Sequence, residues 1–277
     1  MCGESLRMDA TVSSPVSTTK LPSLFVSHGA PTLPLEDIPA REFLKRIGSE
    51  YPDASAVLCI SAHWETEIPE VNAVDIPSTI HDFYGFPSEL YRIRYPARGS
   101  PELANRVTGL LKKAGMECDV DGGRGLDHGA WVPLMLMFPR GNVPVVQLSI
   151  QHHLDTTQHL KLGSAISGLR EEGVLILGSG GAVHPLGYAD FREGKETDKW
   201  ALAFDDWLAD AVTLGDADAL LAFRKIAPFP ERAHPRPDHF MPLLTALGAA
   251  GKGAKGKVLH RSWQYGDLGM AAYSFDK

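Results

Sequence analysis

The histidines are the residues of this chain whose placement could support chemistry. The chain has eleven, and His28, His63 and His184 each follow a segment rich in Val, Ile and Leu, or lie a short glycine turn beyond one. Such segments are typical of buried strands in a parallel sheet, and ligands of these sheets gather outside the carboxyl ends of the strands. Imidazoles from neighbouring strand ends can share one zinc or iron ion. The sequence therefore predicts a mononuclear metal site at one edge of a sheet.

Two more histidines have informative neighbours. His239 follows Asp238 at the start of a helical pattern, where a carboxylate can accept a hydrogen bond from the imidazole and orient it. His128 follows Asp127 in a long loop-like segment. A lone histidine in such a setting is more often a hydrogen-bonding loop residue than a ligand, but three at matching strand ends favour a shared ion. Glycines, among them Gly29 after His28, permit close backbone approach to such a site.

The elements that must position these side chains alternate along the sequence. Short apolar runs predict four strands: Ser23–Ser27, Ala56–Ser61, Val143–Ile150 and Gly173–Leu177. Helical patterns lie between and after them: Glu36–Ser49, Pro101–Ala114, Thr157–Glu172, Lys199–Ala211, Ala217–Ile226 and Pro237–Ala250. This alternation predicts an α/β fold with a mostly parallel central sheet flanked by helices. Two late strands, Lys257–His260 and Met270–Phe275, are expected to add an antiparallel edge.

Two segments, 65–100 and 118–142, lack helical periodicity and are rich in Pro, Gly and aromatic residues. Long irregular insertions of this kind are commonly lids or substrate loops. The Ser/Thr-rich residues 1–20 are expected to form a disordered leader. Residues 21–277 are then long enough to form a single catalytic domain around one continuous core.

Bulk composition excludes several classes of protein. The net charge of -7 and the lack of a basic cluster argue against nucleic-acid binding, and no run of about 18 apolar residues predicts a membrane-spanning helix. Three cysteines without a C-x-x-C pair form no disulfide framework, which fits a reducing cytoplasm. The phosphate-loop, nucleophile-elbow and H-E-x-x-H sequences are all absent.

A set of short motifs carries a family resemblance that runs from about residue 21 to the C-terminus. Its main members are Ser27-His28-Gly29-Ala30-Pro31, Ser61-Ala62-His63-Trp64, Thr79-Ile80-His81-Asp82-Phe83-Tyr84-Gly85-Phe86-Pro87, Asp127-His128-Gly129-Ala130-Trp131, Gly178-Ser179-Gly180-Gly181-Ala182-Val183-His184 and Pro237-Asp238-His239-Phe240-Met241-Pro242-Leu243. In this order they resemble the class III extradiol ring-cleavage dioxygenases, and within them the DOPA 4,5-extradiol dioxygenase-like branch. The resemblance implies the single-domain fold of that family.

The resemblance also implies roles for individual residues. It assigns His28, His63 and His239 as metal ligands, with His239 in the place of the glutamate that better-known relatives use. His184 matches a position that is either a metal neighbour or the acid/base histidine, and His128 matches a second active-site histidine that touches substrate or oxygen.

The loop of residues 77–98 is expected to shape substrate choice. Its His81 and Phe83 are candidate substrate-binding residues, and so is Trp64 beside His63, which is also expected to wall the site from water. The aromatic residues of this loop could equally serve simple packing.

Together with the resemblance, these residues imply an enzyme that opens a catechol-type, DOPA-like ring with O2 at a non-haem metal and releases a ring-opened semialdehyde. One divalent metal per chain is expected, Fe(II) for turnover with Zn(II) as an alternative occupant. A zinc-dependent hydrolase and a non-catalytic binding protein on the same fold are the alternatives. The expected partners are an aromatic diol and O2, and a monomer and a homodimer both remain open.

Overall fold

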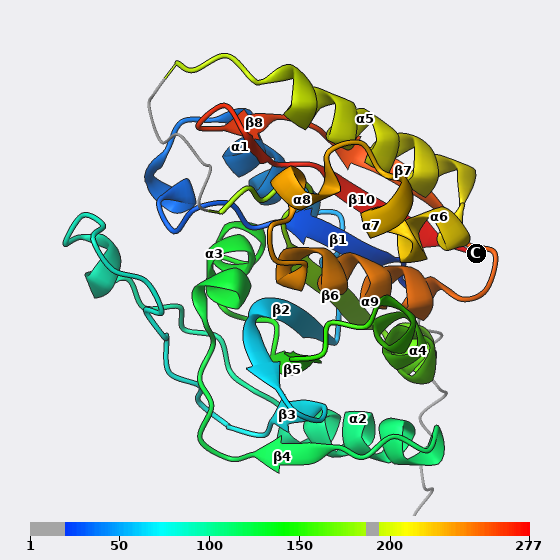
Figure 1. Cartoon of the computed structure of the whole chain (residues 1–277). Helices are drawn as coiled ribbons and strands as arrows, with labels where there is room; N and C mark the ends of the chain where they lie inside the picture. The colour runs from blue at the N-terminus through cyan, green and yellow to red at the C-terminus, as the bar shows by residue number, and fades with distance from the viewer. Residues whose placement is uncertain (1–19, 187–193) are drawn as a thin grey trace, which may run out of the picture.

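The structure, a computed structural model, describes residues 20–186 and 194–277. The leader expected at residues 1–20 therefore lies, apart from Lys20, outside the described part. Within that part, an eight-stranded mixed sheet lies between two layers of helices (Figure 1). The predicted α/β fold with a mostly parallel central sheet is thus confirmed.

The strands pair in the order β4-β3-β5-β2-β6-β1-β10-β7, and β8 and β9 form a separate hairpin. Their bounds are β1 Ser23–Ser27, β2 Ala56–Thr66, β3 Glu70–Asn72, β4 Asp119–Asp121, β5 Val145–Gln151, β6 Val174–Gly180, β7 Lys255–His260, β8 Trp263–Gln264, β9 Leu268–Gly269 and β10 Ala272–Asp276. The central strands β5, β2, β6 and β1 are all parallel. Beyond β1, strands β10 and β7 run antiparallel to their neighbours, as the sequence predicted.

The helices cover both faces of this sheet. The α-helices are α1 Pro39–Gly48, α2 Pro101–Lys113, α3 His128–Met137, α4 Thr156–Ile166, α5 Lys199–Leu214, α6 Ala217–Leu221, α7 Phe223–Ile226, α8 Pro230–Ala233 and α9 Met241–Ala250. Short 3-10 helices are η1 Leu33–Leu35, η2 Leu90–Arg92, η3 Ser167–Glu172 and η4 Asp238–Phe240. Ser100 caps α2 as its position before Pro101 suggests, because its hydroxyl accepts a hydrogen bond from the Leu103 N–H.

Neighbouring residues of the central strands enter two different cores. In β2, Val57 packs in the core formed with α1 and α3, whereas Leu58 packs in the core formed with α2, α4 and α9. Both faces of the sheet are therefore buried. For this reason the strand sequences are continuous apolar runs rather than alternations of apolar and polar residues. Because the central strands are parallel, their carboxyl ends all lie at one edge of the sheet.

The segment 118–142 differs from the irregular insertion expected there. It contains β4 and the helix α3, and nine of the ten α3 residues are buried. A helix buried on every side has no polar face, so its sequence lacks the periodicity that marks a surface helix. Segment 65–100 does match the expectation. Apart from the last residues of β2, the described residues of this segment form only two short regular elements, β3 and η2. Part of it extends from the body as a long loop (Figure 1).

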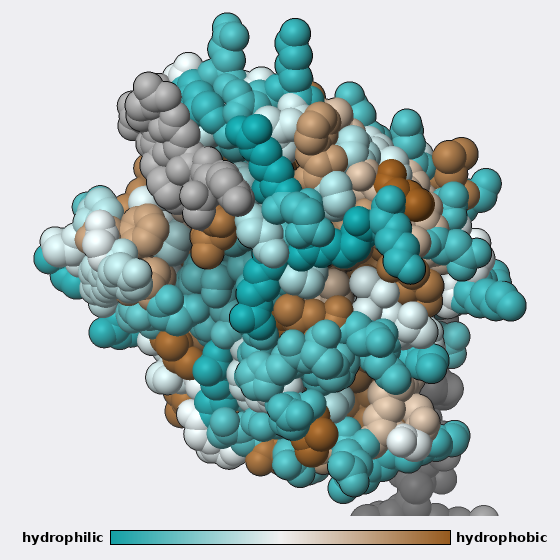
Figure 2. Space-filling model, in the orientation of Figure 1, coloured by the Kyte–Doolittle hydropathy of each residue, from teal (hydrophilic) through white to brown (hydrophobic). Residues whose placement is uncertain are grey.

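The described helices include none that is long and apolar enough to cross a membrane. On the face shown in Figure 2, hydrophilic residues predominate and apolar residues form small scattered groups. This distribution is the ordinary one for a folded domain in water.

Helices α4 and α9 cross at a pair of glycines, and this crossing fixes the helix that follows η4. A Cβ at Gly163 of α4 would lie 2.0 Å from the Thr245 carbonyl oxygen, and one at Gly248 of α9 would lie 2.0 Å from the Leu160 carbonyl oxygen. Backbone therefore packs directly on backbone, and any side chain at this crossing must push α9 away from the sheet.

We expect Gly163→Ala to lower the free energy of unfolding by about 1–3 kcal/mol, the usual range for overpacking. The matched control is Gly109→Ala in α2, where a Cβ would meet nothing within 4 Å. The control should instead stabilise the chain by up to about 1 kcal/mol, because alanine favours helix over glycine. Urea unfolding of both variants measures this difference, and equal midpoints for the two would contradict the packing described.

Candidate metal centre

His28 stands at the carboxyl end of β1. Its backbone N–H donates to the Gly180 carbonyl at 3.0 Å, which ties the end of β1 to the end of β6. The chain then turns sharply at Gly29, whose φ of +64° lies in the left-handed region. A Cβ at Gly29 would also lie 2.5 Å from Gln264 Oε1, at the end of a side chain that would have to move, so the left-handed backbone is the main reason that glycine is favoured at this turn.

His63 lies within β2 rather than beyond it, at a break in the pairing with β5. The register passes from Ile60 opposite Leu148 to Glu65 opposite Ile150. Four residues of β2 thus face only Ser149, and such a bulge re-aims side chains out of the regular ladder. The pairing of β2 with β6 also ends at Ser61, so His63 is free to turn toward His28.

His239 lies in η4, immediately before α9, and small residues at the end of β6 let it come close. A Cβ at Gly180 would lie 2.2 Å from the His239 carbonyl oxygen, and the Gly181 N–H donates to that same carbonyl at 3.0 Å. The glycine turn after β6 therefore serves to admit the start of α9 to the strand edge.

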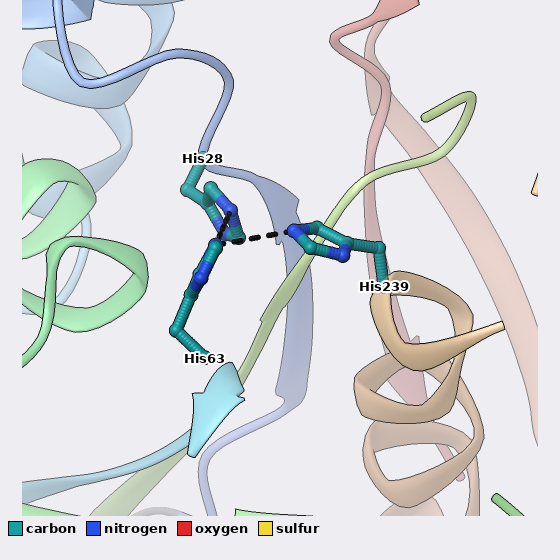
Figure 3. A group of neighbouring side chains, drawn as sticks. All are labelled: His28, His63 and His239. Atoms are coloured by element: carbon teal, nitrogen blue, oxygen red, sulfur yellow. Dashed lines mark hydrogen bonds between the residues drawn. The ribbon is translucent and has the colours of Figure 1, made fainter. Parts of the chain in front are cut away.

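These three imidazoles point toward one another from β1, β2 and η4 (Figure 3). His63 Nε2 lies 3.0 Å from His28 Nε2 and 3.1 Å from His239 Nε2. His28 and His239 are almost fully buried, at 1% and 3% exposure. The convergence on which the sequence prediction depended is thus present in the fold.

The three nitrogens suit a metal ion better than they suit one another. One Nε2 carries either a proton or a lone pair, so His63 Nε2 can satisfy only one of its two close nitrogen neighbours by a hydrogen bond. Nitrogens bound to one zinc or iron at about 2.1 Å lie roughly 3 Å apart, which matches the two distances here. Among the described residues, these three form one of two groups whose ligand atoms lie within 4.8 Å of one another.

The opposite nitrogen of each ring faces an oxygen atom. His28 Nδ1 lies 3.1 Å from Ser179 Oγ, His63 Nδ1 lies 3.5 Å from Asp82 Oδ2, and His239 Nδ1 lies 3.3 Å from Asp238 Oδ1. Oxygen partners at Nδ1 favour the tautomer that keeps the proton there and leaves the Nε2 lone pair for a metal. Asp238 thus lies beside His239, but its carboxylate accepts a hydrogen bond from the His239 backbone N–H at 3.0 Å, and His239 Nδ1 itself makes no hydrogen bond to it.

His128 begins α3, on the other side of His63. Their ring centroids are 3.9 Å apart, and the His128 centroid lies 5.5 Å from that of His28. Asp127 caps this helix, since its buried carboxylate accepts hydrogen bonds from the Ala130 N–H and from Ser61 Oγ. The cap therefore fixes His128 relative to the bulge that carries His63.

His184 stands beside His239 and outside the group of three. Its ring stacks on that of His239, with centroids 3.5 Å apart and an angle of 7° between the planes. Its backbone N–H donates to the Ala233 carbonyl at 2.8 Å. The nearby His234 is instead a core residue whose Nε2 donates to the Ala182 carbonyl at 3.1 Å.

The three residues expected to touch substrate are placed differently. Phe83 meets His128 edge to face, with centroids 5.6 Å apart, and His81 packs behind Phe83 at 5.7 Å. Trp64 is 5% exposed, and the Arg124 guanidinium lies 5.1 Å above its ring. Within the described residues Trp64 forms none of the ring contacts that join Phe83 and the histidines.

Burial is the main cause of the perturbed pKa values in this cluster. It lowers the pKa of His63 to about 3 and that of His184 to about 4, and it holds the pKa values of His28 and His239 well below the usual range. Repulsion between the rings adds to the effect. Burial raises the pKa of Asp82, but contacts with His128 and His63 outweigh it and lower that pKa to about 2. At neutral pH the site thus offers uncharged imidazoles and an ionised carboxylate.

Comparison with known proteins decides the family. The family model described as the catalytic LigB subunit of aromatic ring-opening dioxygenase matches residues 22–276. This chain belongs to the aromatic ring-opening dioxygenases. The resemblance seen in the sequence and the predicted enzyme class, an extradiol dioxygenase, are thereby confirmed, and neither a zinc hydrolase nor a non-catalytic binding protein is favoured.

Relatives within these dioxygenases are similar over most of their length. The chain is 48% identical over 260 residues to the 4,5-DOPA dioxygenase extradiol of Beta vulgaris, covering 91% of this chain and 96% of the relative. It is 35% identical to the protein of the same name from Escherichia coli strain K12, covering 84% and 87%. A crystal structure of an uncharacterized Escherichia coli K12 protein superposes with a TM-score of 0.76 at 29% identity, covering 91% and 98%.

Asp82, Ser179 and Asp127 contact the histidines of this cluster or the residues beside them, although the sequence did not mark them individually. Asp82 lies in the irregular segment 65–100, where no periodicity indicates which side chains face inward. Ser179 lies in a glycine-rich turn whose sequence gives no sign of a contact with His28. Asp127 stood out only as the residue before His128. Their partners are 46 to 151 residues away in the chain, so the fold alone reveals them.

We expect the unfolding free energy of the metal-free chain to fall as the pH drops below about 6.5, the ordinary histidine value. Burial lowers the pKa of His234 to about 3, so between these two values the unfolded chain binds one more proton there than the folded chain. Each such histidine contributes a slope of up to about 1.4 kcal/mol per pH unit.

His234→Phe should therefore reduce that slope by about 1 kcal/mol per pH unit between pH 4.5 and 6, whatever it does to the absolute stability. Urea unfolding of metal-stripped protein across this range measures the slope. A slope equal to that of the unsubstituted chain would show that His234 is protonated in the folded state.

Proposed function

We propose that this chain opens the ring of a DOPA-like catechol with O2 and places both oxygen atoms in a ring-opened semialdehyde product. The observation that carries the proposal is the convergence of the His28, His63 and His239 Nε2 atoms, 3.0 and 3.1 Å apart, at the strand edge. Family membership supports ring opening. The substrate class is taken from relatives named 4,5-DOPA dioxygenase extradiol, which are 42% to 48% identical to this chain in plants.

The resident group is proposed to be one Fe(II) per chain, held by these three imidazoles. Fe(II) held there would supply the redox chemistry needed for a catechol to react with O2, which the side chains of the protein lack. Zn(II) suits the same nitrogen ligands but has no accessible redox chemistry. We therefore expect zinc to occupy the site without supporting turnover.

His184 and His128 are proposed to handle protons on either side of the ligand group. His184 stacks on His239 rather than joining the three convergent nitrogens, which supports an acid/base role over a ligand role. A neutral imidazole there can accept a proton from a substrate hydroxyl and return one later. His128, whose ring adjoins both His63 and Phe83, is placed to hydrogen-bond substrate or oxygen.

Phe83 is proposed to form one wall against the catechol ring, because it is partly exposed and its edge contacts His128. His81 supports that wall from behind, since its Nε2 lies 3.2 Å from the Ile93 carbonyl and its ring packs on Phe83. Trp64 closes the far side of His63 to water. A reducing cytoplasm is the proposed location, in which the buried thiols of Cys59 and Cys118 stay free.

The direct test is O2 consumption by metal-stripped protein reloaded anaerobically with Fe(II) and then mixed with DOPA and air. We expect one O2 consumed per catechol and a yellow semialdehyde product, and we expect the zinc-loaded protein to show neither. Ester or amide hydrolysis by the zinc-loaded protein, without O2 uptake by the iron-loaded protein, would instead establish a hydrolase.

Two substitutions should distinguish the proposed metal ligand His28 from the proposed acid/base residue His184. His28→Ala removes one of three nitrogens, so we expect retained iron to fall below a tenth of its normal value. His184→Gln should lower kcat by about 100-fold, within the usual range for general acid–base catalysis, while iron content stays near one per chain. Iron analysis and steady-state kinetics measure both effects. Equal loss of iron and activity in His184→Gln would make His184 a ligand, and stoichiometric iron in His28→Ala would remove His28 from the set.

A further inference from the structure

Asp82 is the one carboxylate among the described residues that approaches two of the five site histidines at hydrogen-bonding or ion-pair distance. Its Oδ2 lies 2.9 Å from His128 Nδ1 and 3.5 Å from His63 Nδ1. Its Oδ1 accepts a hydrogen bond from the His128 backbone N–H at 2.9 Å. The loop of residues 77–98 therefore places the Asp82 carboxylate between the end of β2 and the start of α3, and the Asp82 side chain is only 24% exposed.

A carboxylate in this place restricts the proton positions on both rings. An ionised carboxylate accepts hydrogen bonds but donates none, so an Nδ1 lone pair facing Oδ2 would be repelled. The approach to His128 Nδ1 is oblique rather than linear, but the electrostatic preference does not need a linear bond. Both rings are driven to the tautomer with the proton on Nδ1 and a lone pair on Nε2.

From this geometry we infer that Asp82 is a positioning residue for His63 and His128 together. It holds the His63 lone pair toward His28 and His239, and it holds the His128 lone pair ready to accept a hydrogen bond from substrate. The role of Asp82 at His128 rests on the proposed function, because it concerns substrate. Its role in metal binding at His63 depends only on the imidazole geometry.

A second cation offers the other interpretation of the same contacts, because His63, Asp82 and His128 also bring their ligand atoms within 4.8 Å of one another. That arrangement would place ions on both nitrogens of His63 and so require its ring to lose both protons. A neutral imidazole gives up its last proton far less readily than it binds one ion, so the positioning role is favoured. The count of metal ions per chain separates the two interpretations.

Asp82→Asn is the sharp substitution because the amide cannot reproduce both contacts. If its oxygen accepts from the His128 N–H, its NH2 group faces the two Nδ1 atoms and favours the wrong tautomer on each ring. If the amide is flipped, its NH2 group meets the His128 N–H, donor against donor. In the first orientation the shape is kept and the proton preference is reversed, and in the second the preference survives only against a clash between two donors at the start of α3. Asp82→Glu, which keeps the charge, should recover part of both effects.

We expect Asp82→Asn to weaken Fe(II) binding by 10- to 100-fold, the usual range for a lost partner of a metal-bound histidine. Competition with a chelator measures this without any turnover. At saturating Fe(II) we also expect kcat to fall at least tenfold. Asp75→Asn is the matched control, because it removes the same charge from an exposed position of the same irregular segment and should leave both quantities unchanged.

A double-substitution cycle tests whether the loss of kcat passes through His128. In a His128→Gln background, Asp82→Asn should lower kcat by less than twofold further, yet it should still weaken Fe(II) binding through His63. Asp238→Asn, whose carboxylate faces His239 instead, should combine with His128→Gln without such an interaction.

Three results would overturn the inference. Unchanged Fe(II) affinity in Asp82→Asn would remove its role at His63, and an undiminished kcat effect in the His128→Gln background would remove its role at His128. Two metal ions per unsubstituted chain, reduced to one by Asp82→Asn, would assign a second cation site. Failure of the iron-loaded parent protein to consume O2 with DOPA would reject the proposed function, whereas the Fe(II) affinities would still decide the metal-binding half.

Discussion

The structure depends on one constraint: three imidazole nitrogens must face one point, each with its lone pair free. Each ring must be neutral and must carry its proton on the nitrogen that faces away from the shared point. Burial secures the first condition by lowering the pKa values of His28 and His239. Oxygen atoms at the outer nitrogens secure the second. A protein that met only one of these conditions would hold either a charged cluster or a hydrogen-bonded one, and neither binds a metal well.

The fold meets this constraint by bringing backbone unusually close at the strand edge. Parallel pairing of β1, β6 and β2 places three strand ends together, but a regular edge alone would not aim the rings at one point. The bulge in β2 turns His63, the left-handed Gly29 turns the chain after His28, and the glycine turn after β6 admits His239. The glycine crossing of α4 and α9 then holds the helix behind His239. Small residues and a register break therefore matter as much as the ligands themselves.

The sequence predicted those parts of the molecule in which local pattern and final environment agree. Apolar runs located β1, β2, β5 and β6, and the Ser100 cap located the start of α2, because each feature acts within a few residues. The sequence did not predict helix α3, because a helix buried on every side has no polar face to mark it. It did not predict that His63 lies inside β2, because a bulge depends on the partner strand. It did not predict the contact of Asp82 with His128, because these residues lie 46 positions apart in the chain.

The charge balance of the proposed metal site connects its all-histidine ligand set with the positions of Asp82 and Asp238. Three neutral imidazoles leave the full charge of a divalent ion uncompensated, whereas a glutamate ligand would remove one unit of it. If these three imidazoles hold the ion as proposed, a catechol that has lost its protons would supply the missing negative charge, so the all-histidine set would favour binding of the ionised substrate. Asp82 and Asp238 contribute their charge one layer further out, through the Nδ1 atoms of His63 and His239. Placed there, they would orient the proposed ligands without binding the ion themselves.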